Sequence, residues 1–437
     1  MRVGVIGLGY VGLVHGAILA EIGHDVLLAD VDREKIAKLR KGDIPIHEPG
    51  LADLLESGVK SDRIHYTHEV ERAADFGEVL FICVGTPPNA DGTTNLSHVI
   101  SASQMIGAGM QSYKVVVVKS TIPVGGTAIV RDAITAAQKK PIPFDVVSNP
   151  EFLREGRAVE DAMYADRIII GSTSRDATAR LTKLYLPLET QTLSVDPKAA
   201  ELIKYASNAF LATKISFINQ LADLCERLGV DIEEVAIGMG MDKRIGPAFL
   251  KAGLGWGGSC FPKDISAFLA LGKENYCDLD IIAAAQKVND EVVPQFISKL
   301  ADRMGSLQDK RIVVLGLSFK ADTDDMRGSR AVEVIHQLLD RGADIIAHDP
   351  VSMPSAKRIL PQGITYVKDM KSLFKNADAV IICTEWKEYA ELDWHKMKDL
   401  MRSAILFDGR NLLDPYEMLA IGFDYYAIGR GIDMRND

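Results

Sequence analysis

A cysteine among glycines and charged residues is the group in this sequence best suited to nucleophilic chemistry. Cys260 lies in GWGGSCFPKD (255–264), where the glycines expose the backbone and Lys263 supplies a cation nearby. Such a cation stabilises the thiolate, which is the nucleophilic form of the side chain. Cys83 and Cys383 instead fall within apolar strand patterns, where a thiol packs as a small hydrophobic group. We therefore predict a reactive thiol at position 260.

A lysine and an asparagine one helical turn apart could stabilise negative charge on an oxygen. Lys204 and Asn208 belong to a helical pattern over about 198–227, AAELIKYASNAFLATKISFINQLADLCERLGV, whose middle carries only one further charge. Residues i and i+4 share a helix face, and an ammonium beside an amide can polarise a developing alkoxide. A solvated surface pair is the alternative interpretation. Because a helix this apolar is buried between domains or between subunits, the pattern also predicts a homodimer interface.

Two carboxylates and two threonines follow strand patterns. Glu151 and Glu155 in SNPEFLREG are spaced so that both would face one cleft if a helix begins there. The alternative is ordinary acidic charge at a helix N-terminus. Thr86 in VGTPP and Thr121 in KSTIPVG follow apolar strands, at the edge where parallel sheets bind ligands.

A glycine-rich turn near the start of the chain predicts a dinucleotide site. Gly7, Gly9 and Gly12 form G-x-G-x-x-G after the apolar strand pattern 3–6, and Asp30 ends the next strand pattern. These glycines allow a tight turn, close approach of a pyrophosphate and close helix packing, while the acid binds the ribose hydroxyls. A carboxylate there repels a 2′-phosphate, which favours NAD over NADP. The alternative is a glycine turn that holds no cofactor.

A thiol and a nicotinamide together would permit oxidation past an aldehyde. The thiolate would add to the aldehyde carbon, the thiohemiacetal would lose a hydride, and water would hydrolyse the resulting thioester. The sequence therefore predicts an enzyme that can take an alcohol to a carboxylic acid.

Strand patterns alternate with helix-length segments in two parts of the chain. The first series, at 27–29, 79–84, 115–118, 146–148 and 168–170, predicts a parallel, doubly wound α/β sheet. After residue 310 the pattern returns in KRIVVLGLSFK, DIIAHDP and NADAVIICTEW. This second part resembles the first, but its helix-opening turn has lost the later glycines, so we expect it to bind a different nucleotide.

Composition limits the partners. The 437 residues carry a formal charge of −10 and a pI of about 5.5, which argues against nucleic acid or an anionic membrane as the partner. Five scattered cysteines without a C-x-x-C pair fit a reducing compartment, and no run of about 18 apolar residues is present to cross a bilayer. We expect a cytoplasmic protein. Neither the histidines nor the cysteines are spaced as metal ligands, so no metal is predicted.

The motifs together resemble the nucleotide-sugar dehydrogenase family along the whole chain. The resemblance is carried by GLGYVG, PIHEPGL, VGTPP, STIPVG, SNPEFLREG, KYASNAF, GGSCFPKD, GLSFKADTDDMR and TEWKEY. It implies two Rossmann-like domains joined by a long helix in a helical middle domain: an NAD-binding domain (1–197), a dimerisation domain (198–305) and a UDP-sugar-binding domain (306–437). PIHEPGL and AMYADRIIIG are more similar to members acting on UDP-glucose than to those acting on GDP-mannose or N-acetylmannosamine.

The resemblance also assigns roles to individual residues. It makes Cys260 the nucleophile and Lys204 and Asn208 the oxyanion stabilisers, while Asp264, Thr121 and Glu151 share the handling of water and protons. It places the cofactor at Gly7, Gly9, Val11, Gly12, Asp30, Lys35, Thr86, Thr121, Glu155, Lys263 and Arg327. It places the sugar nucleotide at Glu151, Phe152, Leu153, Glu155, Lys204, Asn208, Phe249, Leu250, Lys251, Ala252, Gly253, Gly257 and Lys320, with Arg244 reaching the neighbouring subunit's sugar.

The implied activity is four-electron oxidation of UDP-glucose to UDP-glucuronate with two NAD. Three alternatives remain. The same chemistry could act on a UDP-N-acetylhexosamine or GDP-mannose, or the chain could be a two-electron hydroxy-acid dehydrogenase in which Cys260 only packs. The third is an NAD-binding sensor without catalysis.

Overall fold

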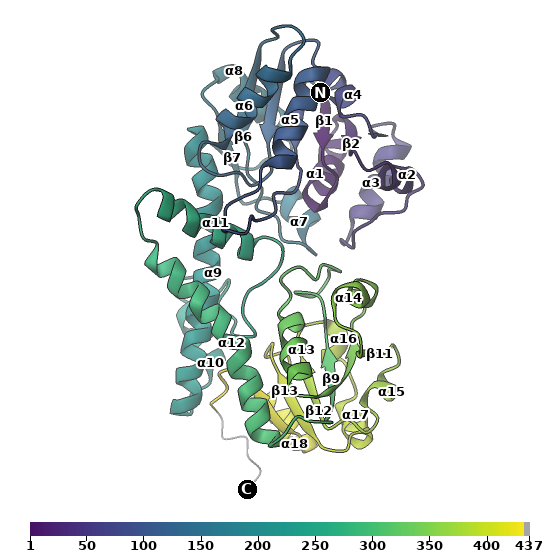
Figure 1. Cartoon of the computed structure of the whole chain (residues 1–437), viewed down its shortest axis with the longest axis vertical. Helices are drawn as coiled ribbons and strands as arrows, with labels where there is room; N and C mark the ends of the chain where they lie inside the picture. Colours follow the sequence, from purple (N-terminus) through teal and green to yellow (C-terminus); the bar gives the residue numbers. More distant parts are fainter. Residues whose placement is uncertain (432–437) are drawn as a thin grey trace. The chain divides into compact units, whose positions relative to one another are not determined.

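The computed structural model describes residues 1–431, which form two compact units (Figure 1). Unit 1 comprises 1–207 together with 266–275, and unit 2 comprises 208–265 and the chain from 276 onward. Two helices, α9 (Pro197–Leu228) and α11 (Phe261–Glu274), contribute residues to both units.

Unit 1 is built on an eight-stranded sheet in the order β3-β2-β1-β4-β5-β6-β7-β8. The order reverses at β1, which lies between β2 and β4, and such a reversal is where doubly wound sheets bind ligands. The predicted α/β fold and the predicted strands are confirmed. The strands are β1 (Arg2–Ile6), β2 (Asp25–Ala29), β3 (Ile64–Thr67), β4 (Val79–Ile82), β5 (Lys114–Val118), β6 (Phe144–Ser148), β7 (Ile168–Gly171) and β8 (Thr192–Val195).

One strand pair departs from the predicted parallel arrangement. β7 meets β6 antiparallel, at Gly171 and Ser148. Parallel neighbours need a full crossover, usually through a helix, whereas the connection 149–167 contains only the short α7 (Ala158–Met163). The prediction of a wholly parallel sheet is wrong at this pair.

Helices cover both faces of the unit 1 sheet. β1, β4 and β5 bury alternate apolar side chains on one side against α1 and on the other against α5 and α6, because parallel strands are enclosed on both faces. The helices are α1 (Tyr10–Glu21), α2 (Arg33–Leu39), α3 (Leu51–Lys60), α4 (Val70–Phe76), α5 (Ser97–Gly109), α6 (Gly126–Ala137), α7 and α8 (Arg175–Tyr185), followed by a 3-10 turn at Leu186–Leu188.

Unit 2 contains a second, six-stranded sheet, parallel throughout, in the order β11-β10-β9-β12-β13-β14. The predicted second Rossmann-like fold is confirmed. Its strands are β9 (Arg311–Leu315), β10 (Asp344–His348), β11 (Thr365–Tyr366), β12 (Ala379–Ile382), β13 (Ile405–Asp408) and β14 (Asp424–Ala427). Its sheet helices are α13 (Arg330–Asp340), α14 (Met353–Ile359), α15 (Met370–Phe374), α16 (Lys387–Ala390), α17 (Trp394–Leu400) and α18 (Pro415–Ile421).

The turn after β9 differs from the prediction that GLSFK opens a helix. The chain runs from Gly316 to Ser329 before α13 begins. Asp349, which follows β10 as Asp30 follows β2, is fully buried and accepts the N–H groups of Leu317 (2.8 Å) and Ser318 (3.1 Å). This carboxylate therefore holds the start of a long loop.

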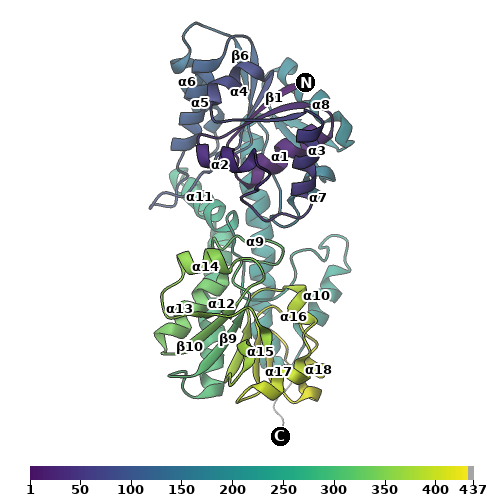
Figure 2. The same cartoon turned by 90° about the vertical axis from the view of Figure 1, so that its right-hand side faces the viewer.

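α9 is the longest helix and confirms the helix predicted over 198–227 (Figure 2). It packs with α10 (Ile232–Gly240) and α12 (Asp280–Met304) in unit 2. In the single chain, Phe210, Phe217, Leu224 and Leu228 of α9 are 66%, 47%, 49% and 66% exposed. The predicted burial of this helix between subunits stays a prediction. Among the described helices, none combines the length and apolar character that crossing a bilayer requires.

Candidate active site

The glycine turn between β1 and α1 leaves room for a pyrophosphate. Gly7 has φ +93°, and a Cβ on Gly12 would lie 1.9 Å from the carbonyl oxygen of Gly7, so both positions require glycine. A Cβ on Gly9, the residue before α1, would meet nothing within 4 Å. The open space thus adjoins the helix N-terminus, where unpaired N–H groups attract phosphate. The residues present fit a dinucleotide.

Asp30 lies beside this turn. Its carboxylate accepts the N–H groups of Leu8 (2.8 Å) and Asp32 (3.0 Å) and pairs with the Lys35 ammonium at 2.9 Å. The structure thus brings together Asp30, the predicted ribose-binding acid, and Lys35, another predicted cofactor residue. Because each of its two oxygens accepts one backbone N–H, the carboxylate is held in a fixed orientation.

We expect Asp30→Asn to weaken NAD binding about 5- to 30-fold, because a neutral amide replaces a charge-assisted hydrogen bond. The substitution also removes repulsion of a 2′-phosphate and releases Lys35 to bind it, so affinity for NADP should rise. Titration calorimetry with both dinucleotides measures the two effects. Asp32→Asn is the control, since Asp32 only caps α2. Unchanged affinities in Asp30→Asn would contradict the assignment.

The other predicted residues of unit 1 occupy the sheet's carboxyl edge. Thr86 follows β4 and is buried, and Thr121 follows β5 and is half-buried. Val11 lies in the first turn of α1. The two threonines thus follow strands at the carboxyl edge of the sheet, as the sequence predicts.

Glu151 and Lys204 form a buried pair. The Lys204 ammonium lies 2.6 Å from Glu151 Oε1 and 2.7 Å from its carbonyl oxygen, and the two side chains are 4% and 7% exposed. Glu151 Oε2 accepts the N–H of Leu153 at 2.7 Å. The predicted lysine is thus held by two oxygens of the predicted acid. Lys204 also lies 5.5 Å from the ring centroid of Phe152.

The helix expected to align Glu151 with Glu155 does not form there. The segment 151–157 is irregular, and α7 begins only at Ala158. The buried carboxylate of Glu48 explains why the helix starts no earlier, because it accepts the N–H groups of Gly156 (2.6 Å) and Ala158 (2.7 Å). Sequence reasoning missed this cap, since Glu48 in PIHEPGL is more than a hundred residues away.

In unit 2, Asn208 and Asp264 form a second buried polar pair. Asn208 Nδ2 donates to Asp264 Oδ2 at 2.7 Å, and the residues are 6% and 2% exposed. Lys263 pairs with the other oxygen of Asp264. The positive charge of Lys263, which was expected to act on Cys260, is therefore neutralised by the Asp264 carboxylate.

Cys260 is half-buried and immediately precedes α11. Its sulfur lies 3.6 Å from the Ser259 hydroxyl, and its carbonyl oxygen accepts the Asp264 N–H at 2.9 Å. The N-terminal end of a helix favours negative charge, so this position stabilises a thiolate without Lys263. Cys83 and Cys383 are buried, and burial raises the pKa of each thiol to about 12, which confirms their packing role.

The predicted substrate loop is tied down by backbone hydrogen bonds. The N–H groups of Gly253, Leu254 and Trp256 donate to Asn219, Gly409 and Asn289. Leu250 and Ala252 are buried, Lys251 is exposed and Phe249 adopts φ +65°. Gly257 is required by packing, since a Cβ there would lie 2.0 Å from the carbonyl oxygen of Gly328.

The three remaining predicted cations of unit 2 are partly or largely exposed. Arg244 pairs with Asp242 and Arg327 with Asp325, each at 2.6 Å, while Lys320 lies 5.8 Å from the Phe319 ring centroid. Their roles stay predictions.

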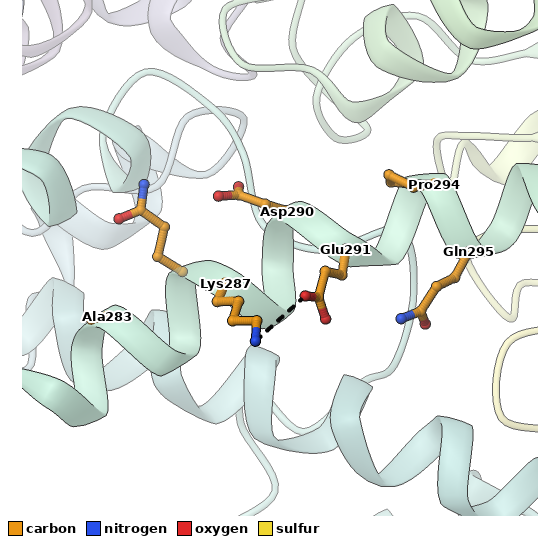
Figure 3. Close-up of a pocket in the computed structure, with 7 residues that line it drawn as sticks. Ala283, Lys287, Asp290, Glu291, Pro294 and Gln295 are labelled. Carbon is orange, nitrogen blue, oxygen red and sulfur yellow. Dashed lines mark ion pairs between the residues drawn. The ribbon is translucent and has the colours of Figure 1, made fainter.

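A shallow groove also runs along α12, and its lining includes none of the predicted site residues (Figure 3). One helix supplies its whole lining, including the Lys287–Glu291 ion pair, so it offers no converging chemistry. It is not the candidate active site.

A doubly wound sheet with a phosphate turn, an acid for ribose, a buried acid–lysine pair and a buried acid–amide pair defines a nicotinamide-dependent oxidoreductase. Comparison with known families shows which group of oxidoreductases the chain belongs to. Residues 1–189, 198–291 and 313–415 match the NAD binding, central and UDP binding domains of the UDP-glucose/GDP-mannose dehydrogenase family. The chain belongs to this family, and its cofactor is NAD.

Individual relatives match over almost the full length. UDP-glucose 6-dehydrogenase TuaD of Bacillus subtilis (strain 168) is 44% identical over 98% of this chain and 93% of its own. UDP-glucose 6-dehydrogenase YwqF of the same strain is 43% identical over 98% of both. Among solved structures, a UDP-glucose dehydrogenase from Pyrobaculum islandicum matches with TM-score 0.90 and 42% identity over 94% of both chains. A UDP-D-ManNAc dehydrogenase from Pyrococcus horikoshii matches with TM-score 0.87 and 27% identity over 99% and 100%.

Proposed function

We propose that this enzyme oxidises C6 of UDP-glucose twice, converting UDP-glucose, two NAD and water into UDP-glucuronate and two NADH. The observation that carries the substrate is the contrast in identity: relatives named for UDP-glucose share 40–44%, and the structure named for UDP-D-ManNAc shares 27%. The same contrast argues against the N-acetylhexosamine alternative.

NAD would be held at the Gly7–Gly12 turn with its ribose on Asp30, and two NAD molecules in succession would each supply the acceptor for one hydride. In the first oxidation the Lys204 ammonium stabilises the C6 alkoxide. Glu151 positions that ammonium through two oxygens at 2.6 and 2.7 Å. Pre-positioned charge of this kind costs no reorganisation when the alkoxide forms.

The second oxidation uses the groups of unit 2. The Cys260 thiolate adds to the aldehyde carbon. The oxyanion that forms from the aldehyde oxygen accepts an N–H of Asn208. An amide NH₂ has two donors, and Asp264 takes one of them at 2.7 Å, which orients the other. After hydride loss the thioester is hydrolysed and the thiolate leaves.

Asp264 is our choice among the three candidates for the residue that activates the hydrolytic water. Asp264 and Cys260 are i,i+4 at the start of α11 and therefore share a helix face.

The test is stoichiometry with a panel of nucleotide sugars. NADH is followed by absorbance for UDP-glucose, a UDP-N-acetylhexosamine and GDP-mannose, and products are identified by mass spectrometry. Two NADH per UDP-glucose, and loss of activity on thiol alkylation, are expected. One NADH per sugar with free aldehyde, or resistance to alkylation, would support the two-electron alternative, and no turnover at all would support the sensor.

We also propose a homodimer through α9. The exposed side chains of Phe210, Phe217 and Leu224 recur every seven residues, with Leu228 one turn beyond, and form a single apolar stripe. Such a stripe marks an interaction surface. All five cysteines are thiols, which supports the cytoplasm as the location.

We expect Phe210→Glu/Phe217→Glu to be monomeric at micromolar concentration, because two charges on each copy would be desolvated at the interface. Light scattering after size exclusion measures the mass. Leu186→Glu, which charges another exposed leucine, is the control. A variant that stays dimeric would place the interface elsewhere.

A further inference from the structure

A second lysine lies beside the Glu151–Lys204 pair, in a polar network that the sequence did not reveal. Lys119 directly follows β5, and its ammonium donates to Asn149 Oδ1 at 3.2 Å. Asn149 directly follows the neighbouring strand β6; its backbone N–H donates to Val118 (2.9 Å) and its side-chain Nδ2 to Ile169 (2.7 Å). Tyr185 donates to the same Oδ1 at 2.6 Å. The position of Lys119 is thus fixed from two strands.

The network adjoins the proposed chemistry. Glu151 is two residues beyond Asn149, and its carboxylate and carbonyl oxygens hold Lys204. Lys119 keeps part of its surface exposed, yet its ammonium is deep enough that burial lowers its pKa to about 8. Cys83 and Glu151 oppose that shift and Lys204 adds to it, which places the two lysines and the acid within electrostatic reach of one another.

The cluster formed by Lys119, Lys204, Glu151, His15 and Cys83 carries more positive than negative charge. His15 (α1) and Cys83 (after β4) also face Lys119, but burial lowers the pKa of His15 well below its ordinary value and raises that of Cys83 to about 12, so both are neutral near pH 7. Two ammonium groups therefore surround one carboxylate. The cluster carries a net charge of about +1 when Lys119 is protonated.

This surplus has a consequence for an anionic intermediate. The Glu151–Lys204 pair alone is neutral, so the carboxylate cancels much of the attraction that Lys204 offers to an alkoxide. We propose that Lys119 is a positioning residue that supplies the surplus positive charge of this site and so enables the Lys204–Glu151 pair to stabilise the alkoxide. In a site shielded from water, one added charge acts strongly over several ångströms. The inference rests on the proposed function for the identity of the intermediate.

The experiment compares pH profiles of Lys119→Met and Lys119→Arg with wild type. Wild-type kcat should fall as pH rises through about 8, because deprotonation of Lys119 removes the surplus charge. Lys119→Met should lower kcat about 10- to 100-fold below pH 8, less than or equal to the loss of a direct oxyanion donor, and should lack that fall. KM for UDP-glucose should change less than twofold. Lys119→Arg keeps its charge at high pH, so its kcat should hold above pH 8.

Lys114→Met is the matched control. Lys114 is a buried lysine of the same strand, at its opposite end, where it donates to the Asp75 carbonyl oxygen at 2.8 Å. Its loss should leave the pH profile unchanged. A wild-type profile in Lys119→Met, or equal losses in the Met and Arg variants at every pH, would overturn the proposal.

A second readout does not depend on turnover. In enzyme labelled at the lysine ε-carbons, NMR titration should show one resonance changing near pH 8 that Lys119→Met removes. Because the like charge of Lys204 helps to lower the pKa of Lys119, Lys204→Met should move this resonance to a higher pH. If wild type reduces no NAD with any sugar, the proposed function fails. The titration still shows whether Lys119 carries a positive charge below pH 8. A Lys119 resonance that does not move in Lys204→Met would overturn the inference.

Discussion

Cys260→Ala should stop formation of the uronic acid, with at least about a 10³-fold fall in turnover, because no other group can carry the covalent intermediate. NAD should still bind with wild-type affinity, since its turn and Asp30 lie in unit 1. Small amounts of aldehyde from the first oxidation should become detectable by trapping with a hydrazine. Acid is quantified by chromatography, and NAD affinity by calorimetry.

Cys277→Ala provides the comparison, because Cys277 is the exposed thiol of the same unit and has no proposed role. It should retain full activity and remain sensitive to alkylation at Cys260. Undiminished acid production by Cys260→Ala would remove the sulfur from the chemistry and leave α11 with only a packing cysteine at its start.

Lys204→Met should lower kcat about 10²- to 10³-fold with little change in KM, because the ammonium acts on the alkoxide more than on the ground-state alcohol. The fold should also lose about 3–5 kcal/mol, since Glu151 becomes a buried carboxylate without its cation. Chemical denaturation measures the stability change, and steady-state kinetics measures the rate.

The double variant Lys204→Met/Glu151→Gln separates these two effects. Removing both charges should recover most of the stability while leaving the rate low. Lys214→Met, which removes the other lysine of the α9 middle, should be nearly neutral because that side chain donates only to carbonyl oxygens at 245 and 246. Recovery of kcat in the double variant would show that Lys204 acts only by neutralising Glu151.

The strands and the phosphate turn could be predicted because their signals are local. Continuous apolar runs identify β1, β4 and β5, and the spacing of Gly7, Gly9 and Gly12 identifies the turn. The candidates Lys204, Asn208 and Cys260 were found in the same way, from unusual chemistry in a short segment.

What could not be predicted depends on contacts between distant segments. The sequence 151–158 predicts the start of a helix at Glu151. In the structure α7 begins only at Ala158, because Glu48 accepts the N–H groups of Gly156 and Ala158. Lys119 follows a strand pattern, and nothing in that pattern predicts its hydrogen bond to Asn149, thirty residues away. Sequence alone could not show either pairing, because each is a property of neighbouring strands or loops in the folded sheet.

The buried Asp349 limits how this protein could be re-engineered. Its carboxylate is fully enclosed and also accepts the N–H groups of Val351 and Ser352 at 3.0 and 2.7 Å. An acid so completely occupied has no lone pair left for a ribose diol. Restoring the missing glycines after β9 would therefore not give the enzyme a second coenzyme pocket; the whole stretch from Gly316 to Ser329 would have to be shortened first.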